Sequence, residues 1–234
     1  MKVIGMIGGM SWESTTSYYQ ALNTLTNQRL GGFHSAKICL YSVDFAEIEA
    51  LQRAGEWTKM AAILSNAAKS LQAAGADCIL ICTNTMHKVA PEVQSSVSIP
   101  LLHIADPTGN ALVSNGVTKV GLLGTRFTME QAFYRERIET NFGISVVVPN
   151  EKQQAEVHRI IYEELCHGQI LDSSKATYLD VIGSLAEQGA QAIILGCTEI
   201  ALLIKPSDTV TPLYDTTHLH AQHAVEFALV RIKK

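Results

Sequence analysis

Two short polar turns carry the residue types best suited to moving a proton. Residues 196–199 read Gly-Cys-Thr-Glu, and residues 82–87 read Cys-Thr-Asn-Thr-Met-His; we refer to them as the Cys197 turn and the Thr83 turn. A thiolate is an effective base, and N–H groups at a helix start can lower a thiol pKa of roughly 8.5 toward neutrality. The apolar stretch that begins at Ile200 would supply such donors, which would also bind a substrate carboxylate.

An internal repeat relates the two turns. Residues 70–85 (SLQAAGADCILICTNT) and 184–199 (SLAEQGAQAIILGCTE) both run from a helical pattern through an apolar strand into a polar turn. A weaker echo links residues 4–8 with residues 120–124. The offset of the first repeat is 114 residues, since 197 − 83 = 114, and it pairs Thr83 with Cys197 and Asn84 with Thr198.

Alternating apolar runs and amphipathic stretches predict an α/β fold with parallel sheets covered on both faces. The clearest amphipathic helix is Trp57–Ala74, and the predicted strands are Lys2–Ile7, Ala36–Tyr41, Cys78–Ile81, Leu101–Ile104, Lys119–Leu123, Ile144–Val148, Ala192–Leu195 and Val210–Leu213. We expect two similar domains related by a pseudo-twofold axis, one of residues 1–115 plus 209–234 and one of residues 116–208. Because ligands bind beyond the carboxyl ends of parallel strands, we expect the active site in the cleft between the domains, with Thr83 opposite Cys197.

Four turns resemble those of the aspartate/glutamate racemase family. The Thr83 turn is similar to the family's Cys-Asn-Thr-x-His motif, and the Cys197 turn matches its Gly-Cys-Thr-Glu motif. Gly8-Gly9-Met10-Ser11 resembles the N-terminal Gly-Gly-Met turn, and Leu123-Gly124-Thr125 a fourth strand-end turn. The resemblance spans essentially the whole chain. It implies two α/β domains, no cofactor, a homodimer, and two opposed bases that act on a small-molecule amino acid.

Racemisation requires proton transfer on both faces of Cα, and two fixed groups solve that geometry better than one travelling group. The sequence departs from the family pattern at one of them, because the first catalytic cysteine aligns with Thr83, and Cys82 comes one position early. Adjacent side chains of an extended segment point in opposite directions, so Cys82 is expected outside the cleft that Thr83 faces. We therefore predict Cys197 as the competent base, Thr83 as the weaker partner, and unequal rates in the two directions.

The residues expected to bind the substrate lie in these turns and in one helix. They are Met10, Gln52, Asn84, Thr85, Thr125, Thr198 and Glu199. Aspartate-type family members hold the distal carboxylate with an arginine and a lysine. Here the lysine position falls at Cys166, and no arginine aligns cleanly within Glu47–Arg53, where Gln52 or Arg53 would substitute. The substrate is thus aspartate, glutamate or a broader set.

Each candidate also has an ordinary structural interpretation. Cys197 could be a small buried hydrophobe, Thr83, Asn84 and Thr85 could cap or form a turn, and Glu199 could be a helix-start charge. His87 is expected to pack or hydrogen-bond rather than catalyse. His218, His220 and His223 lack the spacing of a metal site and are expected at the surface.

The overall composition excludes several classes of protein. The 234 residues are 47% hydrophobic and 17% charged, as in a globular chain. The net charge of −4 argues against nucleic acid as a partner, and the apolar runs are strand-sized, too short for a membrane span. Five cysteines form neither a disulfide framework nor a metal set, so we expect reduced thiols, a cytoplasmic location and no metal. A dinucleotide-binding glycine pattern is also missing.

Together these patterns predict a cofactor-independent amino-acid racemase, an isomerase that does not use pyridoxal phosphate. Two alternatives remain. One is another reaction of the same superfamily, of the hydantoin racemase, maleate isomerase or decarboxylase type. The other is a non-catalytic module that binds an amino acid.

Overall fold

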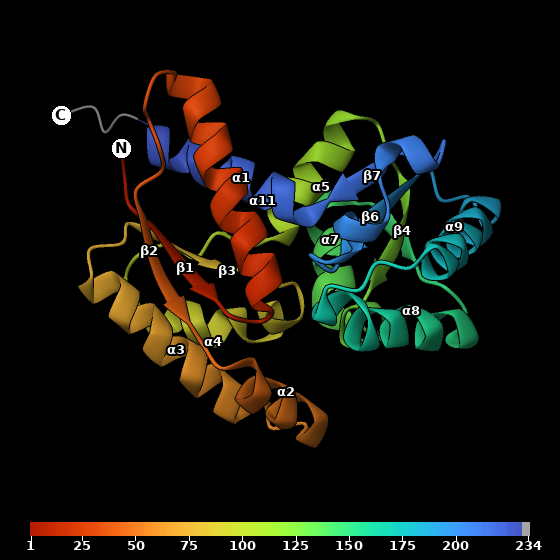
Figure 1. Ribbon diagram of the computed structural model, residues 1–234, viewed down its shortest axis with the longest axis horizontal. Helices are drawn as coiled ribbons and strands as arrows, with labels where there is room; N and C mark the ends of the chain where they lie inside the picture. The colour runs from red at the N-terminus through yellow and green to blue at the C-terminus, as the bar shows by residue number, and fades with distance from the viewer. Residues whose placement is uncertain (231–234) are drawn as a thin grey trace. The chain divides into compact units, whose positions relative to one another are not determined.

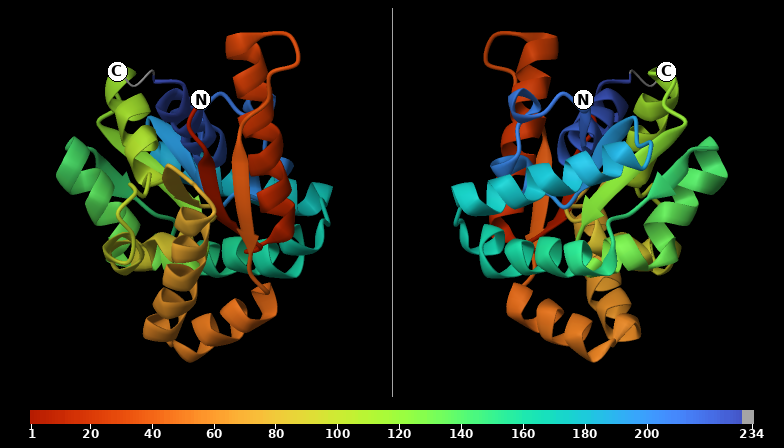
Figure 2. Two further views of the ribbon diagram at one scale, coloured as in Figure 1. Left: turned by 90° about the vertical axis from the view of Figure 1, so that its left-hand side faces the viewer. Right: turned by 90° about the vertical axis from the view of Figure 1, so that its right-hand side faces the viewer.

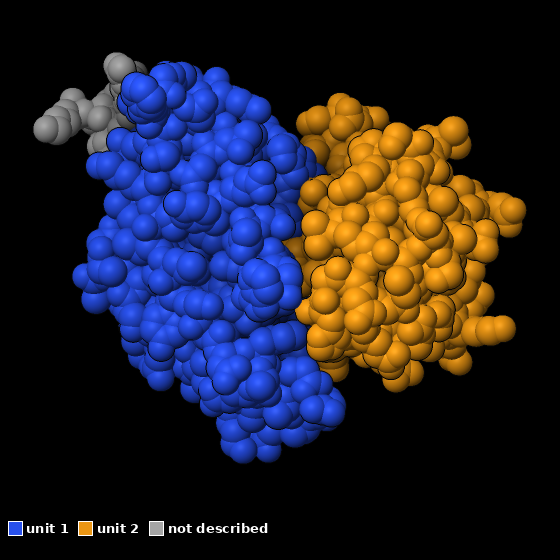
Figure 3. All heavy atoms as spheres, viewed as in Figure 1, with its two compact units in different colours: residues 1–104, 217–234 blue, residues 105–216 orange. Residues whose placement is uncertain are grey.

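The computed structural model describes residues 1–230, which form two compact units (Figures 1 and 3). Unit 1 comprises residues 1–104 and the chain from residue 217 onward, and unit 2 comprises residues 105–216. Residues 105–115 and 209–216, which we expected in the N-terminal domain, therefore lie in unit 2. The first segment carries Asp106, which accepts two hydrogen bonds from Arg137 of the same unit. The second carries a strand that pairs within the sheet of unit 2.

Unit 1 contains a three-stranded parallel sheet in the order β2-β1-β3. The strands are β1 (Ile4–Gly8), β2 (Ile38–Ser42) and β3 (Cys78–Ile81), and the arrows of β1 and β2 point the same way in Figure 2. Its helices are α1 (Trp12–Leu30), α2 (Phe45–Ala54), α3 (Trp57–Ala73), the 3-10 helix η1 (Thr85–Val89), α4 (Ala90–Ser95) and α11 (Thr216–Leu229), whose first residue belongs to unit 2.

Two apolar layers cover the faces of this sheet. Ile7, Ile79 and Ile81 pack with residues of α2, α3 and α4. Met6 and Leu80, one step along their strands, pack with residues of α1 and α11. Side chains alternate between faces along a strand, so continuous apolar strands are needed to fill both layers.

The segment expected as a fourth strand of this half, Leu101–Ile104, forms only one isolated parallel bridge, between Ile79 and Leu101. Leu102 N–H donates to the Ile79 carbonyl at 2.9 Å, but the next backbone groups bond to side chains. The Leu102 carbonyl pairs with His220, and Ile104 N–H donates to His87. The predicted strand is therefore wrong beyond its first residues, because histidines satisfy the groups that a ladder would have used.

Unit 2 contains a four-stranded parallel sheet in the order β5-β4-β6-β7. The strands are β4 (Lys119–Gly124), β5 (Ser145–Val147), β6 (Ala192–Gly196) and β7 (Leu213–Asp215). Its helices are α5 (Ala105–Ser114), α6 (Arg126–Glu130), α7 (Ala132–Phe142), α8 (Glu151–Glu163), η2 (Leu165–His167), α9 (Asp172–Glu187), α10 (Ile200–Leu203) and η3 (Pro206–Asp208). The strand expected over 210–213 starts only at Leu213, and Val210 is fully exposed.

The sequence repeat corresponds to a repeated structure. In unit 1, Gly75 (φ 89°) follows the end of α3, and Asp77 N–H donates to the carbonyl of Val3 at 2.8 Å. In unit 2, Gly189 (φ 92°) follows the end of α9, and Gln191 N–H donates to the carbonyl of Lys119 at 2.9 Å. β3 then pairs in parallel with β1, and β6 with β4. The expected α/β class with two similar parallel-sheet halves is confirmed.

Gly9, which follows β1, occupies a backbone position that excludes other residues. Its φ of 89° is in the region that L side chains rarely adopt, and a Cβ would lie 2.2 Å from the Val43 carbonyl oxygen. Gly75 has the same φ of 89°, yet a Cβ there meets nothing within 4 Å. A substitution at Gly75 would therefore introduce backbone strain alone, whereas a substitution at Gly9 would add a steric collision.

We predict that Gly75→Ala lowers the free energy of unfolding by about 1–2 kcal/mol, the cost of a positive φ in an L residue. Gly9→Ala should lower it by a further ~1–3 kcal/mol, because the new methyl group collides with backbone. Urea unfolding of both variants measures the difference. Equal losses would show that the turn at Gly9 relaxes without cost.

Candidate active-site turns

In unit 1, the ends of β1 and β3 are adjacent because Ile7 pairs with Ile81. Met10 follows β1 and is buried, and Thr83 follows β3 and is half-buried. Asn84 and Thr85 are buried where η1 begins. These four expected site residues therefore follow neighbouring strand ends.

Gln52 comes from α2, and its position is set by a contact with the helix that follows the Thr83 turn. Its side chain is buried, and Nε2 donates to the Met86 sulfur at 3.4 Å. Met10, Ile48 and Met86 belong to one apolar cluster of unit 1. Gln52 is thus a buried polar side chain in contact with an apolar cluster that contains methionines.

Cys82 is set apart from Thr83, as the alternation of side chains predicts. Its side chain is 1% exposed and packs with Ile4, Met6 and Tyr18 in the apolar layer under α1 and α11. Burial raises the pKa of its thiol, with no other contribution. Cys82 is therefore a core residue and a poor candidate for a base.

In unit 2, the ends of β4 and β6 meet where Gly124 pairs with Gly196. A Cβ at Gly196 would lie 2.7 Å from the Leu123 carbonyl, so a glycine is needed for this approach. Thr125 follows β4 and caps α6, with its hydroxyl accepting from Thr128 N–H at 3.4 Å. The Cys197 turn follows β6, so the unit gathers Thr125 and this turn at one edge of its sheet.

The Glu199 carboxylate is the centre of the Cys197 turn. Its Oε2 atom accepts hydrogen bonds from Cys197 Sγ at 2.9 Å and from Thr198 Oγ1 at 2.7 Å. The Cys166 sulfur lies 4.0 Å from the other oxygen, Oε1. Glu199 is 2% exposed, so this is a buried carboxylate in direct contact with the candidate base.

The pKa of the Cys197 thiol is raised well above its ordinary value. Burial is the largest cause, followed by the Glu199 carboxylate and Cys166. A hydrogen bond from Glu199 N–H acts in the opposite direction, as expected for a turn at a helix start, but is the smallest contribution. The thiol therefore holds its proton and directs it at Glu199, and the lowering toward neutrality that the sequence suggested does not occur here.

Two further residues lie near this edge, and neither belongs to one of the four turns. Cys166 reaches Glu199 from η2, 33 positions earlier in the sequence. His158 of α8 accepts from Arg126 N–H at 3.2 Å, and its ring lies 4.6 Å from that of Tyr162. Burial, followed by the charge of Arg126, lowers the pKa of His158. Cys166 stands where aspartate-type family members carry a lysine, whereas the only sequence signal for His158 is its spacing of one helical turn from Tyr162.

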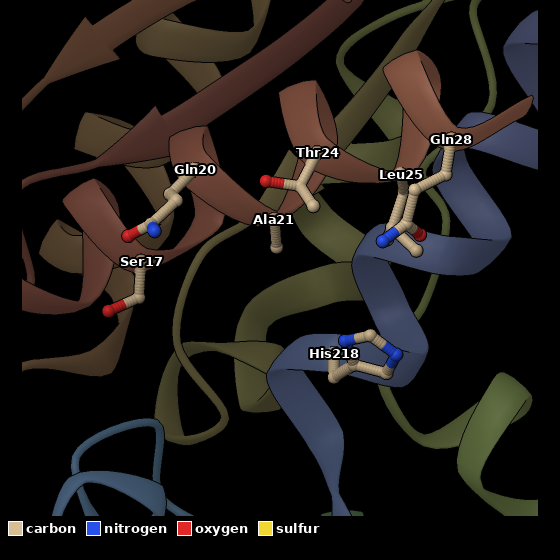
Figure 4. Close-up of a pocket in the computed structure, with 7 residues that line it drawn as sticks. All are labelled: Ser17, Gln20, Ala21, Thr24, Leu25, Gln28 and His218. Atoms are coloured by element: carbon tan, nitrogen blue, oxygen red, sulfur yellow. The ribbon is translucent and has the colours of Figure 1, made fainter. Parts of the chain in front are cut away.

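A surface groove of about 250 Å³ lies elsewhere in unit 1 (Figure 4). It is lined by polar side chains of α1, among them Ser17, Gln20 and Thr24, and by His218 of α11. None of the expected site residues lines it, so we assign it no role in catalysis.

Residues 1–230 contain neither a cluster of metal ligands nor a membrane-spanning helix. No three His, Cys, Asp or Glu side chains in this range are grouped so that they could hold a metal ion. Within the same range, no helix has the length and apolar character needed to cross a membrane.

Two parallel-sheet α/β units, each with a polar turn after the corresponding strand, define a duplicated α/β fold of the racemase type. The family model described as Asp/Glu/Hydantoin racemase matches residues 7–224, and the chain belongs to this family. The expected membership of the aspartate/glutamate racemase family is confirmed.

Solved structures agree over the whole chain. A candidate Asp/Glu racemase from Yersinia pestis is 54% identical, with a TM-score of 0.91 over 98% of this chain and 100% of that one. An aspartate racemase homologue from Pyrococcus horikoshii is 36% identical, with a TM-score of 0.84 over 97% and 99%. A broad specificity amino-acid racemase from Bacillus subtilis is 29% identical over 70% of each chain.

The contact between Glu199 and Cys197 predicts how the thiol reacts. Glu199→Gln removes a negative charge that raises the thiol pKa, so the pKa should fall and the thiolate fraction at a given pH should rise. Alkylation of Cys197 by iodoacetamide should therefore begin at lower pH in the variant than in the native protein. Mass spectrometry that resolves each cysteine measures this, with Cys39 of unit 1 as an internal reference. An unchanged profile would mean that the carboxylate does not control the thiol.

Proposed function

We propose that the protein is a cofactor-independent amino-acid racemase in which Cys197 and Thr83 exchange protons with opposite faces of Cα. The observation that carries the proposal is the Cys197 thiol hydrogen-bonded to the buried Glu199 carboxylate at the end of β6, in a chain that belongs to a racemase family. A thiol and a carboxylate at hydrogen-bonding distance form a unit that can release and recover one proton.

On the Cys197 face, the reaction begins with proton transfer from the thiol to Glu199, which leaves a thiolate and a carboxylic acid. The thiolate then removes the Cα proton, so the electron pair of the Cα–H bond stays on carbon and the thiol is formed again. Donors that bind the substrate carboxylate stabilise the negative charge that spreads onto it. Glu199 returns its proton to water when the cycle closes.

On the other face, Thr83 delivers a proton to the carbanion and recovers one from water. Its side chain is half-buried at the end of β3, where water can reach it. A hydroxyl is a much weaker acid and base than a thiol, so this step is the slower one. Proton balance holds, because the hydroxide formed at Thr83 is neutralised by the proton that Glu199 gives up.

The proposed substrate-binding groups are Met10, Gln52, Asn84, Thr85, Thr125, Thr198 and Glu199. They follow the strand ends of the two sheets or pack against the residues there, as described above. We propose aspartate, glutamate or a broader set of amino acids as substrates. The breadth is supported by Cys166, a neutral residue where aspartate-type family members carry a lysine, and by the name of the B. subtilis relative.

We further propose that the enzyme works in the cytoplasm as a homodimer. Its five cysteines are free thiols, as suits a reducing compartment. Light scattering of the purified chain tests the dimer.

Incubation with single enantiomers in heavy water tests the function itself. A racemase exchanges the Cα hydrogen for deuterium and inverts the centre. An enzyme of the hydantoin racemase, maleate isomerase or decarboxylase type would transform a different substrate, and a binding module would do neither.

Cys197→Ser should lower the rate of racemisation by about 10²–10⁴-fold, because serine retains the size of the side chain but not the accessible anion. Circular dichroism should show an unchanged fold. Racemisation at a near-native rate by the variant would contradict the assignment of Cys197.

The weaker acid at Thr83 predicts an asymmetry between the enantiomers. The enantiomer that presents its Cα–H to Cys197 should exchange with deuterium faster than it inverts, and the other should hardly exchange. Thr83→Cys should raise the slow direction most, because it places a thiol on that face. NMR of each enantiomer measures both rates. If both enantiomers exchange equally in the native enzyme, and Thr83→Cys changes neither rate, Thr83 is not the weaker partner.

A further inference from the structure

A buried group of aromatic polar side chains lies directly behind the Thr83 turn, and the proposed reaction does not use it. His87, His103, His220 and Tyr18 all belong to unit 1 and are at most 9% exposed. The ring of His87 lies 4.5 Å from that of His103 and 5.8 Å from that of His220. Tyr18 lies edge-on to His220 at 5.7 Å. The expectation that His220 is a surface residue is therefore wrong, because α11 turns it into the core.

The hydrogen bonds of His87 define its tautomer. Ile104 N–H donates to Nε2 at 3.2 Å, so this nitrogen carries a lone pair and no proton. Nδ1 lies 2.8 Å from the Thr83 carbonyl oxygen, which can only accept. The ring is therefore neutral, with its proton on Nδ1, and it donates to Thr83 while it accepts from Ile104.

His220 has the complementary tautomer. Its Nε2 lies 2.7 Å from the Leu102 carbonyl oxygen, an acceptor, so Nε2 carries the proton. Nδ1 then accepts from the Tyr18 hydroxyl at 2.8 Å. The two histidines thus hold both ends of the segment 102–104, and Ile104 is the residue at which the chain leaves unit 1.

We propose that His87 is a positioning residue for Thr83, resting on the proposed function. Its imidazole joins the backbone carbonyl of Thr83 to the backbone of Ile104 through two hydrogen bonds of fixed direction. This bridge sets the orientation of the Thr83 peptide and so the direction of the hydroxyl that delivers the proton. Misplacement of such a group lowers the rate of the step it serves without affecting the opposite face.

Two substitutions of His87 separate the two bonds. In His87→Asn, the amide nitrogen takes the place of Nδ1 and can donate to the Thr83 carbonyl, but nothing reaches Ile104. In His87→Gln, the amide oxygen takes the place of Nε2 and can accept from Ile104, while the bond to Thr83 is lost. His220→Gln is the matched control, because it retains a donor for Leu102, loses the Tyr18 bond and leaves both hydrogen bonds of His87 in place.

The readout is the ratio of inversion to Cα exchange for the enantiomer that faces Cys197. Exchange without inversion needs only the Cys197 face, whereas inversion also needs Thr83, so general destabilisation leaves the ratio unchanged. We expect His87→Gln to lower the ratio about tenfold or more, His87→Asn to lower it less because the bond to the Thr83 carbonyl is retained, and His220→Gln to stay near native. An unchanged ratio in His87→Gln, or an equal fall in all three variants, would overturn the inference.

The tautomer provides a measurement that does not depend on activity or on a folded variant. Long-range ¹H–¹⁵N correlation spectra of the native protein should show His87 neutral with its proton on Nδ1 and His220 with its proton on Nε2. A proton on Nε2 of His87 would overturn the inference alone. A native protein without Cα exchange on any amino acid would instead overturn the proposed function, and this inference with it.

Discussion

The hydrogen bond from the Cys197 thiol to the Glu199 carboxylate is the interaction on which the proposed chemistry of this protein depends. It gives a donor to a buried carboxylate, which would be unfavourable without one, and the donor is a thiol that keeps its proton. Thr198 supplies a second donor to the same oxygen. The resting state is therefore a protonated thiol beside its own proton acceptor.

The parallel pairing of strands makes this arrangement possible. In each unit the central strand and the strand that precedes the polar turn end together, so residues distant in sequence emerge at one edge. Glycines at 124 and 196 allow the two strand ends of unit 2 to approach closely. The same helix–glycine–strand–turn segment occurs in unit 1, but there the turn offers a hydroxyl, and a histidine behind it holds the backbone.

The two turns are thus supported differently although they occupy corresponding positions of the repeat. Behind Cys197 is a charged acceptor that can take the thiol proton. Behind Thr83 is His87, whose two ring nitrogens hydrogen-bond to the backbone of Thr83 and Ile104. In the proposed reaction the first support acts on the proton itself, and the second acts on the geometry of the weaker acid–base group.

The sequence by itself determined the class of fold, the duplication and the position of the Cys197 and Thr83 turns. Three signals carried this: the apolar periodicity, the glycines that follow predicted helices, and the repeat with an offset of 114 residues. All three can be seen in the sequence without the tertiary structure. It also predicted that Cys82 would be separated from Thr83, because alternation along a strand is a property of the backbone.

Only the tertiary structure decided the rest. Desolvation and the contact with Glu199 reversed the expected pKa shift of Cys197, Cys166 reached that carboxylate from another helix, and His87 and His220 took the backbone groups of a predicted strand. Each of these depends on which side chains, distant in the sequence, come into contact in the folded chain. The energies of burial and of hydrogen bonding between them arise only in that folded state.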